Sequence, residues 1–173
     1  MSGDHPAPDD IRLRPIGIIR TPFREAAGAP IQPSRAHGAR GTVTVFEEYR
    51  AALRDLEGFE RIWLLYWFHR ASAARLRVTP FLDTVERGLF ATRAPCRPNR
   101  IGLSAVELLR IEGNVLEVAG VDMLDETPLL DIKPYAPEFD SYPNAKSGWL
   151  DDLSSEQRLA DDRFSPDQPD GEP

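Results

Sequence analysis

Short strand-like runs joined by short polar links most constrain the fold of this 173-residue chain. Runs rich in β-branched and aromatic residues, or with apolar alternation, lie at residues 11–20, 42–46, 61–69, 75–78, 88–92, 101–111, 115–123 and 129–132. Residues 47–56 instead follow a helical period. Short links favour antiparallel pairing, and Glu112-Gly113-Asn114 predicts a hairpin turn. We therefore predict a mainly β protein, a single antiparallel β-barrel-like domain with one short helix.

The two ends of the chain differ in composition from the rest. Residues 1–10 contain three acids and almost no apolar residue, and residues 151–173 contain eight acids against two arginines. We divide the chain into a flexible N-terminal tail at 1–10, a β-barrel domain at 11–150 and an acidic C-terminal tail at 151–173. Both ends are expected to be mobile, solvated tails, or a docked arm at most.

The formal net charge of −7 arises from these ends, because residues 11–150 carry 19 Lys or Arg against 17 acids. A domain that is close to neutral can still present a basic face to a partner. The acidic composition of the whole chain therefore does not exclude nucleic acid as a partner, although it gives no positive evidence for one.

Several classes of protein are disfavoured by what the sequence lacks. The single cysteine, Cys96, precludes an internal disulfide, and the longest apolar run, Ile62–Phe68, is too short to span a bilayer. The three histidines, His5, His37 and His69, are far apart in sequence, so no metal site is expected. Glycine-rich nucleotide motifs and a hydrolase elbow are also missing. We expect a cytoplasmic protein that uses neither a membrane nor a metal.

Four polar stretches stand in loops or at the ends of the strand-like runs. They are residues 29–34, 69–70, 87–104 and 122–135. The first carries Gln32 and Ser34 on a proline-stiffened loop, and the third crowds Arg93, Arg97 and Arg100 onto proline-rich backbone. The planar guanidinium of arginine suits a carboxylate or a phosphate. Polar stretches from distant parts of the chain at strand ends predict a pocket at one end of the sheet.

Each stretch also has an ordinary structural interpretation. The loop at 29–34 could be plain surface, and His69 could be a packed histidine with satisfied hydrogen bonds. The arginines could pair with the acids of the chain itself. Asp131 and Lys133 could pair with the arginine loop and hold the barrel together. The residue types by themselves leave these interpretations open.

An ordered set of short motifs resembles the TsaA/TrmO-like family. The motifs are Pro15–Phe23, Gln32-Pro33, Gly58-Phe59 with Ile62–Leu65, Phe68-His69, Gly88–Arg93, Arg97–Asn99, Ile101–Ser104, Asp125 with Thr127-Pro128, and Asp131–Tyr135. The resemblance implies a β-barrel, generally a homodimer, that binds S-adenosylmethionine. It also implies methylation of the exocyclic nitrogen of threonylcarbamoyl-adenosine beside the anticodon of tRNA.

The resemblance further implies where the site residues fall. Cofactor contacts are expected at Gln32, Pro33, Ser34, His69, Arg70, Arg93, Leu103, Asp122, Met123, Leu124 and Asp125. From the chemistry of the residues rather than from the resemblance, substrate contacts are expected at Arg97, Asn99, Arg100 and Lys133, and catalytic roles are expected for His69 and Arg97. The chain departs from the family pattern at Arg100, where proline is common, and at Glu126, where glycine is common.

Other functions remain compatible with the sequence. One is an S-adenosylmethionine-dependent methyltransferase of another RNA or of a small molecule. A second is a cofactor-binding or RNA-binding module without catalysis, and a third is a structural barrel whose polar loops serve a dimer interface.

Overall fold

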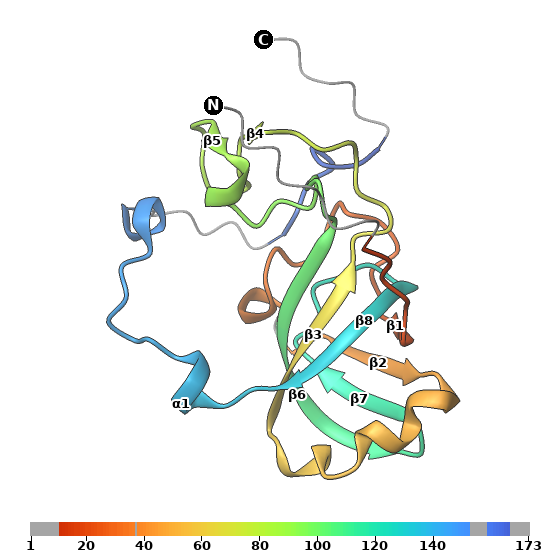
Figure 1. The fold of residues 1–173 in the computed structure, drawn as a ribbon. Helices are drawn as coiled ribbons and strands as arrows, with labels where there is room; N and C mark the ends of the chain where they lie inside the picture. Colours follow the sequence, from red (N-terminus) through yellow and green to blue (C-terminus); the bar gives the residue numbers. More distant parts are fainter. Residues whose placement is uncertain (1–10, 37, 153–158, 167–173) are drawn as a thin grey trace, which may run out of the picture.

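Six antiparallel strands close into a barrel in the order β1-β2-β7-β6-β3-β8 (Figure 1). The computed structural model describes residues 11–36, 38–152 and 159–166. The barrel strands are β1 Gly17–Arg20, β2 Arg40–Val45, β3 Arg61–Trp67, β6 Ile101–Glu112, β7 Val115–Ala119 and β8 Thr127–Pro134. The predicted fold class, a mainly β antiparallel barrel, is confirmed, and so is the predicted hairpin, which joins β6 to β7.

The remaining elements are short. A two-stranded sheet pairs β4 (Arg77–Val78) with β5 (Arg87–Gly88). The helical segments are η1 Pro33–Arg35, η2 Glu47–Leu53, η3 Leu56–Gly58, η4 Leu89–Ala91, α1 Pro137–Asp140 and η5 Gly148–Asp152. Among the described residues, no helix has the length and apolar character needed to cross a membrane.

Two predicted elements differ from the structure. The helix predicted at 47–56 is present as the 3₁₀ helix η2, which ends at Leu53 before Asp55 takes a left-handed conformation with φ of 66°. The strand predicted at 88–92 is wrong, because the chain turns into η4 directly after β5. The inward turn buries Leu89, which is 2% exposed, in a small apolar cluster outside the barrel.

The barrel interior is filled by side chains that alternate along each strand, as the pleat of a strand requires. On β3, Ile62, Leu64 and Tyr66 point inward and are buried. Trp63 lies on the other face, where its ring contacts Tyr135 at a centroid distance of 5.6 Å. The continuously apolar run at 61–69 suggests a strand buried on both faces, but the structure buries only one, because only the inward face of a barrel strand meets the core.

Residues 159–166 form an arm that packs back onto the domain (Figure 1). Leu159 makes a β-bridge with Pro30, and Ala160 exchanges backbone hydrogen bonds of 2.7 and 2.9 Å with Ala29 and Gly28. Phe164 is 6% exposed in the small apolar cluster that also contains Val78, Leu89, Ala94 and Cys96. The acidic C-terminal region is expected from sequence to be either a mobile tail or a docked arm, and residues 159–166 form a docked arm. The tail predicted at 1–10 lies outside the described residues.

Candidate functional site

A pocket of about 330 Å³ opens at one end of the barrel. The antiparallel order places three connections at this end, namely β1–β2, β3–β6 and β7–β8, because β1, β3 and β7 all finish there. The arm forms a further part of the wall. A cavity of this size lies within the range of about 300–1,000 Å³ that is typical of small-molecule sites.

The pocket brings together most of the cofactor residues predicted from sequence. Those that line it are Gln32, His69, Arg70, Arg93, Leu103, Asp122, Met123 and Leu124, together with Arg97 from the predicted substrate set. These residues come from all three connections and from the start of β6. The predicted meeting of distant polar stretches at one end of the sheet is therefore what the structure shows.

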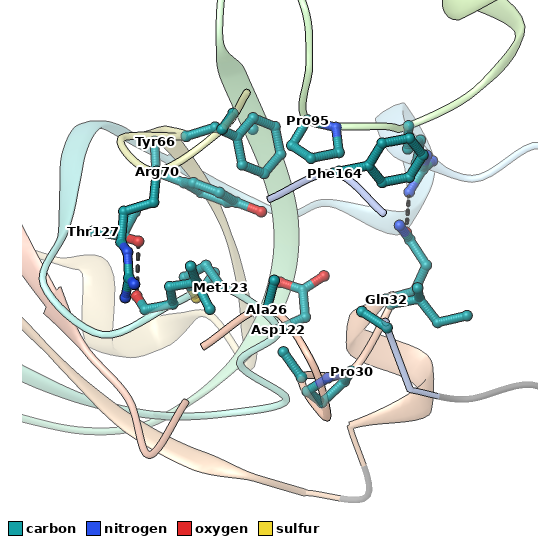
Figure 2. A pocket seen from close by; sticks show the side chains of 18 of the residues that line it. Ala26, Pro30, Gln32, Tyr66, Arg70, Pro95, Asp122, Met123, Thr127 and Phe164 are labelled. Carbon is teal, nitrogen blue, oxygen red and sulfur yellow. Dashed lines mark hydrogen bonds between the residues drawn. The ribbon is translucent and has the colours of Figure 1, made fainter. Parts of the chain in front are cut away.

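A hydrogen-bonded chain of three side chains runs from the barrel core to the pocket. Ser104 donates a hydrogen bond of 2.6 Å from its hydroxyl to Oδ1 of Asp122, and the hydroxyl groups of Tyr66 and Ser104 lie 3.1 Å apart. Tyr66 and Ser104 are 3% and 1% exposed. Figure 2 shows the Asp122 carboxylate between Tyr66 and Pro30. These hydrogen bonds therefore fix the orientation of the Asp122 carboxyl group, which faces the cavity.

Gly102 makes room for this arrangement. A Cβ atom on Gly102 would lie 2.2 Å from Cε2 of Tyr66, so any side chain there would displace the ring. The ring also contacts Phe68 edge to face, with a centroid distance of 5.3 Å. Glycine at this position thus allows a tyrosine to cross the barrel end and reach Ser104.

The electrostatics of Asp122 are unusual for a carboxyl group. Burial raises the pKa of Asp122 to about 7, and this rise is only partly opposed by the Ser104 hydrogen bond and the charge of Arg93. Burial, followed by the nearby Asp122 carboxylate, raises the pKa of Tyr66. Asp122 can therefore exchange a proton near neutral pH, whereas Tyr66 stays protonated.

His69 lines the pocket two residues after the end of β3. Its Nδ1 is 3.4 Å from the hydroxyl of Thr127, which itself donates a 2.7 Å hydrogen bond to the carbonyl of Leu124. Partial burial, and then the charge of Arg70, lower the pKa of His69, so the imidazole is neutral at pH 7.

Arginines surround the mouth of the pocket. Nη1 of Arg93 donates a 2.7 Å hydrogen bond to Oε1 of Gln32, and Arg70 donates to the carbonyl of Arg24. Arg97 donates to the carbonyl of Thr92 at 3.1 Å. Among the described residues, no ion pair joins Arg93 or Arg97 to an acid, which disfavours the interpretation that these arginines only balance the acids of the chain.

Six predicted site residues do not line the pocket. They are Pro33, Ser34, Asn99, Arg100, Asp125 and Lys133. Asp125 accepts a 3.1 Å hydrogen bond from the backbone N–H of Thr21, so it holds the loop after β1. Lys133 lies six positions along β8 from the pocket residue Thr127, and it forms a 3.0 Å ion pair with Asp131. That pair replaces the expected contact with the arginine loop.

Sequence reasoning missed several residues that line the pocket or support it. They are Tyr66, Gly102, Thr127, Ala160, Asp161 and Phe164 in the lining, with Ser104 behind Asp122. Gly102 and Ser104 point inward and alternate with the outward Ile101 and Leu103. A small or polar residue at an inward strand position, where an apolar one is expected, is the sequence signal that could have indicated the pocket. No group of three or more metal-ligating side chains occurs in the part of the chain that the structure describes.

The family profile of the tRNA-methyltransferase O N-terminal domain matches residues 18–141, which carry the barrel and most of the pocket. The chain belongs to this family. It is 53% identical to a probable S-adenosyl-L-methionine-binding protein of Pyrococcus abyssi, over 82% of this chain and 77% of that protein. It is 37% identical to a tRNA (adenine(37)-N6)-methyltransferase of Mus musculus, over 78% of this chain and 33% of that protein.

Solved structures agree with the sequence relatives. The crystal structure of TrmO from Pseudomonas aeruginosa superposes with a TM-score of 0.69 at 41% identity, covering 81% of this chain and 62% of that one. The chain therefore spans less than two thirds of the solved TrmO chain and one third of the mouse enzyme. The shared part is the barrel domain of the family.

Proposed function

We propose that this protein binds S-adenosylmethionine in the barrel-end pocket and methylates the exocyclic nitrogen of threonylcarbamoyl-adenosine beside the anticodon of tRNA. Family membership supports the reaction class, since the relatives include proteins named for S-adenosyl-L-methionine binding and for tRNA methylation. The observation that carries the proposal is the half-buried carboxyl of Asp122, held by Ser104 in a pocket of the right size.

The chemistry of the pocket fits S-adenosylmethionine. Its amino-acid carboxylate suits the guanidinium groups of Arg93 and Arg70 at the mouth, and its positive charges suit the carboxylate of Asp122. Leu103 and Met123 provide apolar lining for an adenine ring. When bound, the cofactor supplies an electrophilic methyl group attached to a sulfonium.

Asp122 is the residue we assign to proton removal. The acceptor nitrogen carries a hydrogen that must leave when the nitrogen gains a methyl group, and a base works best when its pKa is close to the working pH. The pKa of Asp122 is about 7 and its carboxyl faces the cavity, whereas Tyr66 stays protonated. His69, which is neutral at pH 7, is a second base within the same pocket.

Binding of the tRNA is assigned to residues 97–100. Arg97 lines the pocket and its guanidinium lies over the ring of Phe90 at 5.6 Å, while Asn99 and Arg100 follow it immediately before β6. Arginine binds the threonyl carboxylate or a phosphate through parallel hydrogen bonds. Lys133, at the other end of the barrel, is not near this loop.

We further propose that the protein works in the cytoplasm as a homodimer. Apolar side chains outside the pocket lining are exposed and available for an interface, including Phe90 at 78% beside Arg97 and Leu76 at 77%. Light scattering coupled to size-exclusion chromatography would measure the mass directly. A mass of one chain at working concentration would overturn the dimer.

The reaction is tested by incubating the purified protein with S-adenosylmethionine and tRNA that contains threonylcarbamoyl-adenosine. Digestion to nucleosides and mass spectrometry should show this nucleoside heavier by one methyl group. The control is the same tRNA made without the threonylcarbamoyl group. Methylation of both tRNAs would point to a different acceptor atom, and methylation of neither would overturn the proposed reaction.

A further inference from the structure

The docked arm at residues 159–166 contributes three side chains to the wall of the pocket. Ala160, Asp161 and Phe164 all line the cavity, and Figure 2 shows Phe164 facing it across from Tyr66. The residues matched by the family profile end at 141, so the arm lies outside the matched region. The pocket of this chain is therefore built from the family barrel and a separate segment.

The arm is fixed at both of its ends. At the start, Ala160 donates a 2.7 Å hydrogen bond to the carbonyl of Ala29, and the carbonyl of Ala160 accepts a 2.9 Å hydrogen bond from Gly28. At the end, the ring of Phe164 contacts Phe81 edge to face at 5.0 Å, and Phe81 is itself a pocket residue. A segment held by backbone pairing and by a buried aromatic ring keeps its side chains in a defined position.

Arg163 fixes the charge of the arm. It forms a forked ion pair with Asp161, with nitrogen–oxygen distances of 2.6 and 2.8 Å, and it donates to the carbonyl of Pro80 at 3.0 Å. This pairing lowers the pKa of Asp161, so the carboxylate stays ionised in the pocket wall. An oriented carboxylate of this kind can accept hydrogen bonds from a ligand ammonium or from sugar hydroxyl groups.

We propose that residues 159–166 are part of the S-adenosylmethionine site, closing one wall through Phe164 and presenting Asp161 to the polar groups of the ligand. This inference rests on the proposed function, because it names the same pocket and the same ligand. Since the ligand would touch both the barrel and the arm, its binding should also hold the arm more firmly in place, as linkage between two equilibria requires.

The test compares S-adenosylmethionine affinity by calorimetry between the full chain and a chain that ends at Asp152. A chain that ends at Pro166 is the matched control, because it keeps the arm and lacks only the last seven residues. We expect affinity to fall about tenfold or more without the arm, which corresponds to about 1.4 kcal/mol, and to stay unchanged in the control. Equal affinity in all three chains would overturn the inference.

Point variants and hydrogen exchange make the test independent of truncation. Phe164→Ala should weaken binding, whereas Phe139→Ala, at a site 73% exposed on α1, should not. Addition of S-adenosylmethionine should slow exchange of the Ala160 amide, which is bonded to Ala29. An unchanged exchange rate at saturating ligand would count against the arm. If the full chain does not bind S-adenosylmethionine, the proposed function is wrong. If the full chain binds but the arm variants bind equally well, only the inference about the arm is wrong.

Discussion

The substitution Asp122→Asn tests the role of the half-buried pocket carboxyl most sharply. Asparagine has nearly the same shape and can still accept the hydrogen bond from Ser104, but it cannot take up a proton. If Asp122 removes the proton from the acceptor nitrogen, the turnover number should fall by about 100-fold or more, in line with the usual contribution of a general base. The affinity for S-adenosylmethionine should fall by much less, because the variant loses only the attraction between the carboxylate and the positive charges of the cofactor.

The same substitution should make the protein more stable at alkaline pH. The carboxyl of an unfolded chain loses its proton near pH 3.8, whereas that of folded Asp122 does so near pH 7, so the folded state binds more protons between these values. Stability therefore falls as pH rises through this window. The charged form carries a cost of up to about 4 kcal/mol above pH 7, which asparagine removes.

Two measurements examine these effects. Tandem mass spectrometry of nucleosides gives the methylation rate from pH 5.5 to 9, and the wild-type kcat/KM should rise through pH 7 to a plateau. Urea unfolding at pH 5 and pH 8 gives the stability difference. The matched control is Asp131→Asn, because Asp131 is half exposed and paired with Lys133 at the surface, where ion pairs contribute little. A fully active Asp122→Asn variant, or one no more stable at pH 8, would refute the assignment.

Two further variants test other parts of the account. Gly102→Ala should lower the free energy of unfolding by about 1–3 kcal/mol, because the added Cβ would lie 2.2 Å from the ring of Tyr66. Thermal unfolding measures this loss. An unchanged stability would mean that the ring of Tyr66 is not held against Gly102. Arg97→Ala should weaken tRNA binding about tenfold in a filter-binding assay while leaving S-adenosylmethionine affinity unchanged, and loss of both would place Arg97 in the cofactor site instead.

Much of the barrel is predictable because the information is local. β-Branched residues mark β2, alternating apolar residues mark β6, and the Glu112-Gly113-Asn114 turn marks the hairpin. The composition of residues 88–92 predicts a strand. It carries no information on the tertiary contacts that bury Leu89 in the small apolar cluster when the chain turns into η4. Strand propensity is a weak signal over so few residues, because tertiary contacts decide between a short strand and a short 3₁₀ helix.

The candidate site shows a similar division. Arg93, His69 and Asp122 lie in loops or at strand ends and could be picked out by their polarity. Tyr66 sits in an apolar run and reads as core, because only the three-dimensional register brings its hydroxyl to Ser104.

The arm was obscured by its surroundings. Residues 151–173 contain eight acids, so the composition of the whole region predicts a solvated tail. This composition masks the single aromatic residue, Phe164, that anchors the segment. Asp161 likewise reads as one more tail acid until the structure places it in the pocket wall. Tertiary contacts between segments that lie far apart in sequence cannot be read from local pattern.

The most direct test of the central claim is calorimetric titration of the purified full chain with S-adenosylmethionine, repeated with Arg93→Ala. We expect one site per chain, and affinity at least about tenfold weaker in the variant, because Arg93 lies at the pocket mouth beside Gln32. Absence of heat with the wild-type chain, or equal affinity of the two proteins, would contradict the assignment of this pocket to the methyl donor.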